Sequence, residues 1–122
     1  MLDARKGMVY AGLYSFEGNR IKTVMKESEL SPAGLVREIE GRDIDPRDIV
    51  FLGGGLKPHG EAVKGAFQDA RIAAESLWHI RASNIAQIAH DRHTSGEKGA
   101  APHEITPLYL RKSEAEIKSR NL

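Results

Sequence analysis

The sequence predicts a mixed α/β domain in which three antiparallel strands are followed by strand–helix units. Residues 1–26 form three β-prone segments separated by glycine turns, a pattern typical of a meander. From Ser31 onwards, segments with helical spacing alternate with short apolar runs, as in sheets covered by helices. A length of 122 residues is that of one domain, so we expect residues 1–122 to share a single core.

The three strands follow from residue alternation and turn chemistry. The first is expected over Leu2–Arg5, joined by Lys6-Gly7, where glycine supplies the positive φ of a tight hairpin. The second, Met8–Phe16, is rich in aromatic and β-branched residues. Glu17-Gly18-Asn19 forms the next turn, and Arg20–Lys26 is the third strand. We therefore expect a meander whose first strand begins almost at the first residue, as in a chain cut from a longer one.

A helix should start at Ser31-Pro32, because serine caps free amides and proline fits the first helical position. Gly41 is the expected stop. Its apolar face is predicted to hold Leu35, Val36 and Ile39.

The middle of the chain predicts a strand–helix–strand unit. Ile49–Leu52 is a continuous apolar run, typical of a strand buried on both faces. Gly53–Gly55 ends it, and a helix is expected from His59-Gly60 through Phe67. Arg71–Ala74 is predicted to be a short strand after this helix.

The last third of the chain predicts one more helix and a tail. The helix opens near Ser83 and ends at Gly96, with Ile85, Ile88 and Ala89 facing inward. Residues 96–102 are expected to be a mobile loop, and Ile105–Leu110 to pack back on the sheet. Residues 111–122 carry alternating charges, typical of a solvated tail.

Composition limits the classes of function. A formal charge of +1 gives no strong field toward nucleic acid, membranes or acidic substrates, so we expect no direct tRNA binding. The absence of cysteine excludes a disulfide framework, a thiol nucleophile and cysteine-ligated metals, and it fits a cytoplasmic protein. No apolar run reaches membrane-span length, and residues 1–6 lack the order of a signal peptide.

The most conspicuous motif is the triple glycine Gly53, Gly54 and Gly55, which follows an expected strand and precedes an expected helix. Bare backbone there can approach a phosphate or an adenine closely, and the helix N-terminus favours an anion. A tight connection that needs positive φ explains the same residues. The spacing matches neither of the common nucleotide loops. Asp3 beside Arg5 is either a metal-binding carboxylate with an anion-binding partner or a strand-end ion pair.

Histidine placement predicts neither a metal nor catalysis. His90 and His93 lie three residues apart near a helix end, where the helix dipole favours them, and no third or fourth ligand is near. His59, His79 and His103 are scattered, without a nucleophile motif. We therefore assign no catalytic residue and no metal. Tyr109, Leu110 and Arg111 form a tail segment that either anchors the C-terminus or contacts a partner.

Two stretches resemble the TsaB family, also called YeaZ. Leu2–Tyr14 matches the D-A-R-x-G-x-V-Y segment that opens the family's second domain, and Ile105–Arg111 matches its P-x-Y-L-R segment. Between them, Ile49–Gly55 corresponds to the family's strand and glycine turn, and Arg81–Ala89 to its last core helix. Because family members carry a preceding domain of comparable size, we expect this chain to correspond to the second half.

The resemblance implies an actin-like ATPase superfamily domain, related to ribonuclease H. It further implies a non-catalytic subunit that holds and activates TsaD, with a TsaE-like ATPase, in threonylcarbamoyladenosine (t6A) modification of tRNA. tRNA would be contacted only indirectly. No cofactor is expected, although ATP or ADP could reach a subunit interface.

Under this resemblance, Asp3, Arg5 and the triple glycine are the remnant of a nucleotide site. The alternative is an ATP-binding enzyme or ATPase of the same superfamily, once labelled glycoprotease, that uses these residues as a cradle. Without a neighbouring domain, an apolar face around the first strand should be uncovered, so we expect a homodimer.

Overall fold

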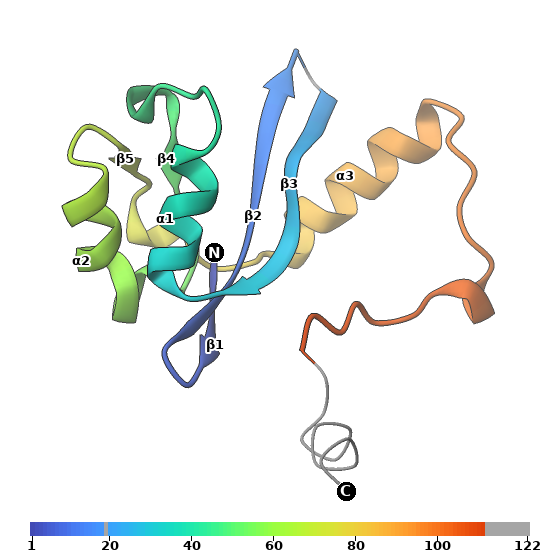
Figure 1. The fold of residues 1–122 in the computed structure, drawn as a ribbon. Coiled ribbons are helices and arrows are strands. Elements are labelled where there is room, and N and C mark those ends of the chain that lie inside the picture. Colours follow the sequence, from blue (N-terminus) through green and yellow to red (C-terminus); the bar gives the residue numbers. More distant parts are fainter. Residues whose placement is uncertain (19, 112–122) are drawn as a thin grey trace, which may run out of the picture.

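A computed structural model describes residues 1–18 and 20–111 (Figure 1). Three strands form an antiparallel sheet in chain order, β1 (Leu2–Arg5), β2 (Met8–Glu17) and β3 (Arg20–Leu30). This confirms the predicted meander. β3 continues beyond the predicted end at Lys26, because Ala11 and Val9 of β2 still pair with Ser28 and Leu30.

The tight connection between β1 and β2 uses left-handed backbone. Gly7 has φ 74°, as predicted, and Arg5 and Lys6 also have positive φ values of 63° and 51°. Gly18 at the next turn has φ 63°, while its neighbour Asn19 lies outside the described residues. The turn glycines therefore have the conformational role that the sequence predicts.

Helix α1 (Pro32–Glu40) confirms both predicted ends. The Ser31 hydroxyl accepts a hydrogen bond from the Gly34 amide at 3.0 Å, which satisfies one of the free N–H groups of the first turn. At the other end, the Gly41 amide donates to the Arg37 carbonyl at 3.0 Å. The buried face of α1 holds Leu35 and Ile39.

The second unit consists of β4 (Val50–Phe51), α2 (Leu56–Ala66) and β5 (Arg71–Ile72), with β4 and β5 pairing in parallel. The predicted start of α2 at His59 is wrong. The helix begins directly after Gly55, because Leu56 and Val63, seven residues apart, occupy its buried face.

β4 is not buried on both faces as expected from its apolar run. Ile49 and Phe51 are buried, whereas Val50 is 44% and Leu52 is 50% exposed. β4 therefore behaves as a strand covered on one side, with alternating burial.

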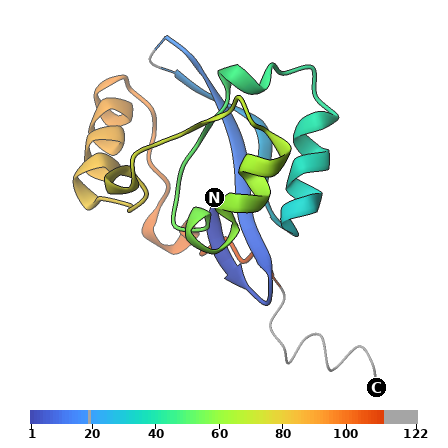
Figure 2. The same ribbon diagram turned by 90° about the vertical axis from the view of Figure 1, so that its left-hand side faces the viewer.

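The core lies where α1 and α2 cover one side of the strands (Figure 2). Phe51 of β4 stacks on Phe67 after α2, with ring centroids 5.8 Å apart. Each fully buried aliphatic side chain contributes about 1.5–3 kcal/mol to folding. The buried cluster consists of Val9, Ala11, Met25, Leu35, Ile39, Ile49, Phe51, Leu56, Val63 and Phe67.

Helix α3 (Ala82–Thr94) lies on the other side of the strands, and it overturns one expectation. It ends near Gly96, which has φ 84°, as predicted. Its apolar residues do not face inward: Ile85 is 57% and Ile88 is 45% exposed, and Ala89 is exposed too. The physical reason is that α3 lies away from the buried cluster formed by the strands, α1 and α2, so its apolar face meets none of these side chains.

The segment after α3 curls away and returns beneath it (Figure 1). We expected Ile105–Leu110 to pack on the sheet, and this is wrong for most of the segment. Ile105, Leu108 and Tyr109 are highly exposed, and only Leu110 is half-buried. Arg111 makes the return contact instead, through an ion pair with Glu29 of β3. The rest of the expected charged tail, residues 112–122, lies outside the described residues.

Candidate functional site

The triple glycine lies against the first strand. The Met1 amine donates a hydrogen bond to the Leu52 carbonyl at 2.6 Å, and the Gly55 amide donates to the Met1 carbonyl at 3.3 Å. These bonds connect the β1–β2–β3 sheet with the β4–β5 sheet. Burial lowers the pKa of the Met1 amine, because desolvation disfavours its charged form.

Two of the three glycines are required by this close approach. Gly53 has φ 109°, and a Cβ atom there would lie 2.0 Å from the Met1 carbonyl oxygen. A Cβ atom on Gly55 would lie 2.8 Å from the backbone of Leu2. Nothing lies within 4 Å of a Cβ placed on Gly54. The space in which Gly53 and Gly55 could receive a phosphate is thus occupied by the chain's own backbone, which does not favour the ATP-binding alternative.

Asp3 lies beside this turn and faces the start of α2. Its Oδ1 accepts a hydrogen bond from the Arg5 amide at 2.9 Å and lies 3.7 Å from Nε2 of His59. That distance is too long for a hydrogen bond, and His59 Nε2 is a buried atom without a hydrogen-bond partner. The His59 amide donates to the Gly55 carbonyl at 3.2 Å, which fixes the histidine over the turn.

The site residues predicted from the sequence are therefore brought together only in part. Asp3 meets the glycine turn, whereas the Arg5 backbone, rather than its guanidinium, contacts Asp3. Sequence reasoning missed His59 as a member of this cluster. The seven-residue spacing of Leu56 and Val63 is the signal that predicts a helix starting at Leu56, with His59 in its first turn. A nucleotide contact at Gly54 stays a prediction.

The tail residues Tyr109, Leu110 and Arg111 differ in their contacts. Arg111 Nε donates to Glu29 Oε1 at 2.6 Å, and this contact lowers the pKa of the Glu29 carboxyl below its ordinary value. Leu110 beside it is half-buried. The Tyr109 side chain is 82% exposed, so it is free to meet another molecule. Arg111 therefore fits the hypothesis that this segment anchors the C-terminus, and Tyr109 fits the hypothesis that it contacts a partner.

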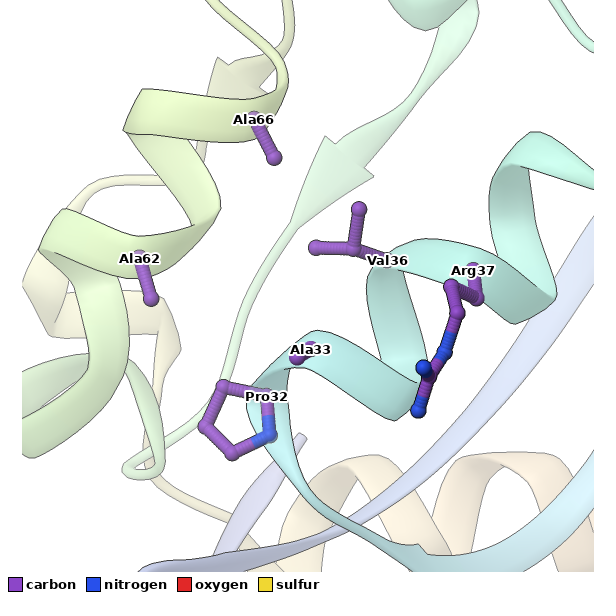
Figure 3. A pocket seen from close by; sticks show the side chains of 6 residues that line it. All are labelled: Pro32, Ala33, Val36, Arg37, Ala62 and Ala66. Carbon is purple, nitrogen blue, oxygen red and sulfur yellow. The ribbon is translucent and has the colours of Figure 1, made fainter.

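A separate hollow of about 380 Å³ lies between α1 and α2 (Figure 3). Figure 3 shows Ala62 and Ala66 of α2 opposite Val36 and Pro32 of α1, with the Arg37 side chain at one side. Small apolar side chains without converging polar groups offer nothing that would orient a substrate. This hollow therefore adds no catalytic feature.

Within residues 1–18 and 20–111, no three histidine or carboxylate side chains gather as they would around a metal ion. His90 and His93 are exposed in the last turns of α3. Among the helices of the described residues, none has the length and apolar character that crossing a membrane requires.

Comparison with known proteins bears on the resemblance seen in the sequence. No protein-family model matches the chain. A curated relative is 26% identical over 119 residues, and the match covers 97% of this chain. That relative is the tRNA threonylcarbamoyladenosine biosynthesis protein TsaB of Bacillus subtilis (strain 168).

The chain resembles TsaB over nearly its whole length. The match covers 48% of TsaB, so the chain spans about half the length of the curated relative it matches. This confirms the recognition made from the D-A-R-x-G-x-V-Y and P-x-Y-L-R segments. The mixed α/β fold, with three antiparallel strands before the strand–helix units, agrees with the fold class predicted from the residue pattern.

Proposed function

We propose that this chain acts in t6A modification of tRNA as a non-catalytic subunit that supports a TsaD-like transferase. The observation that carries the proposal is the similarity to TsaB over 97% of the chain. An actin-like domain is the fold that we propose with it, supported by the order of three antiparallel strands followed by β4, α2, β5 and α3. The cytoplasm, where tRNA is modified, is the proposed location.

A non-catalytic role fits the chemistry of the described residues. Asp3 Oδ1 and His59 Nε2 lie 3.7 Å apart, which is too long for the hydrogen bond of an acid–base pair. The role that we propose therefore needs no bound cofactor or metal. A TsaD-like protein and a TsaE-like ATPase are the proposed partners, with tRNA contacted through them.

The test of the pathway is nucleoside mass spectrometry of bulk tRNA from cells depleted of the gene product that contains this chain. We expect t6A to fall and to return when the gene is expressed again. Unchanged t6A, with depletion verified and no duplicate gene present, would mean that the resemblance marks a shared fold alone.

The partner contact has a test of its own. Capture of TsaD by the immobilised chain should weaken for Tyr109→Ala, because this exposed side chain lies in the segment shared with the TsaB family. Phe16→Ala is the matched control, since Phe16 is a comparably exposed aromatic residue at the tip of the β2–β3 hairpin. Equal capture by both variants would remove Tyr109 from the contact.

A further inference from the structure

Helix α3 and the segment after it leave aliphatic side chains uncovered in the same part of the chain. Ile85 and Ile88 of α3 are 57% and 45% exposed, and Ile105 and Leu108 are each 71% exposed. Isolated helices shorter than about 12–15 residues are marginally stable in water, and most helix stability in proteins comes from packing of an apolar face. α3 has 13 residues, so it needs a cover that the described residues do not give it in this structure.

The chain turns back along the apolar face of α3 as soon as the helix ends. This face holds three residues with the i, i+3, i+4 spacing of one helical side, Ile85, Ile88 and Ala89. Together with residues 97–100 they line a hollow of about 550 Å³. Gly96, with φ 84°, makes the turn, and the Glu97 amide donates to the Arg92 carbonyl at 3.0 Å. The segment after α3 therefore already forms one wall of a hollow whose other wall is the apolar face.

Residues 97–110, which we call the strap, are held at their far end as well. The Arg111 guanidinium pairs there with the Glu29 carboxylate of β3. Figure 1 shows the strap leaving the end of α3 and returning beneath the helix toward the strands. A tethered segment stays at a high effective concentration near the surface that it spans, on the order of millimolar for short flexible linkers. A separate molecule has to reach that concentration in solution before it competes for the same face.

The spacing of aliphatic residues in the strap matches the length of the hollow. Pro107 fixes its own φ near −65° and restricts the residue before it to extended backbone. Ile105 is extended too, with φ −79° and ψ 109°. In a polyproline II segment three residues make one turn, which puts Ile105 and Leu108 on one side, about 9 Å apart. The helical face that lines the hollow runs from Ile85 to Arg92, a rise of about 10 Å.

We propose that the strap closes onto α3 and fills the hollow with Ile105 and Leu108. The strap runs antiparallel to α3, because it turns back at the end of the helix and finishes on β3. This direction brings Leu108 to Ile85, and Ile105 then lies beside the aliphatic stem of Arg92. Closure removes both apolar surfaces from water within one chain. Tyr109 lies a third of a turn from Leu108 in this geometry, so it stays exposed for the partner contact proposed above.

Disulfide formation within one chain tests this contact, independently of any role in tRNA modification. The chain has no cysteine, so a pair of introduced thiols reacts without background. Under mild oxidation, Ile85→Cys with Leu108→Cys should form an intrachain disulfide at least about tenfold faster than Ile85→Cys with Tyr109→Cys, because facing residues meet the distance limits of a disulfide. Mass spectrometry of the monomeric chain follows the bond. Equal rates for the two pairs would mean that Leu108 does not face the helix, and the proposal would fail.

Hydrogen exchange identifies the cover of α3 without a cross-link. Leu108→Glu should speed exchange of the amides in residues 85–92 at least about threefold, because a charged side chain does not enter an apolar hollow. Tyr109→Glu is the matched control and should leave those amides unchanged, since Tyr109 stays outside the contact. Unchanged exchange in Leu108→Glu, or wild-type protection of α3 that rises with chain concentration, would overturn the proposal.

Discussion

At the scale of single residues, Gly53 is the position where a side chain would do most harm. We predict that Gly53→Ala destabilises the fold by about 3 kcal/mol, from the cost of left-handed backbone and the loss of hydrogen bonds as Met1 is displaced. A Cβ atom at Gly53 would overlap the Met1 carbonyl oxygen, whereas one at Gly54 would meet nothing within 4 Å. Urea denaturation of both variants measures the difference. Gly54→Ala should change stability by less than about 0.5 kcal/mol, and equal losses for both variants would contradict this account of the turn.

The same turn shows which structural features can be predicted from single residues and which cannot. Three glycines after an apolar run indicate that something approaches the backbone closely. They do not say whether the approaching group is a ligand or another strand. In the structure it is the backbone of Met1 and Leu2, some fifty residues earlier in the chain. A contact over that separation leaves no local pattern, so it could not be predicted from residues 53–55 themselves.

At the scale of elements, an ion pair between Arg111 and Glu29 links the returning C-terminal segment to β3. We predict that Arg111→Ala increases hydrogen exchange of the amides in residues 105–111, because the Glu29 carboxylate loses its guanidinium partner. Tyr109→Ala, in the same segment, should leave that exchange unchanged, since its side chain is 82% exposed. Exchange that is equal in wild type and Arg111→Ala would show that other contacts hold the segment.

The pH dependence of this link follows from the lowered pKa of Glu29 in the folded chain. Its hydrogen bond with Arg111 is the main cause of the lowering. A carboxyl whose pKa falls on folding stabilises the folded state above its unfolded value of 4.5. That contribution is lost as the pH drops through the lower folded-state pKa. Protection of residues 105–111 should therefore persist at pH 4.5 and disappear in stronger acid.

Elements with local signals could be predicted, and elements that depend on distant partners could not. Ser31, Pro32 and Gly41 set both ends of α1, and glycine turns separate the strands of the meander. The periodicity of α3 was also correct, but the direction of its apolar face was not. Helical spacing identifies an apolar face without identifying the surface that covers it. For α3, no described part of this chain is that surface in the structure.

At the scale of the whole molecule, the fold divides into a packed part and a helix that none of the described residues covers. The buried cluster lies between the strands and the helices α1 and α2, whereas α3 contributes no residue to it. Local stability follows buried contacts, so the two parts should open with different free energies. α3 should open at the lower free energy, because none of its side chains is buried.

Hydrogen exchange of the backbone amides separates these parts. We predict that the amides of α3 exchange faster than those of β2 and α1 in the same sample. The reason is that Ile85 and Ile88 of α3 are exposed, whereas Val9 of β2 and Leu35 of α1 are buried. Ile88→Glu should leave the exchange of β2 and α1 unchanged, because α3 contributes no residue to the buried cluster. Equal protection of α3 and α1 would mean that another surface covers the helix in solution.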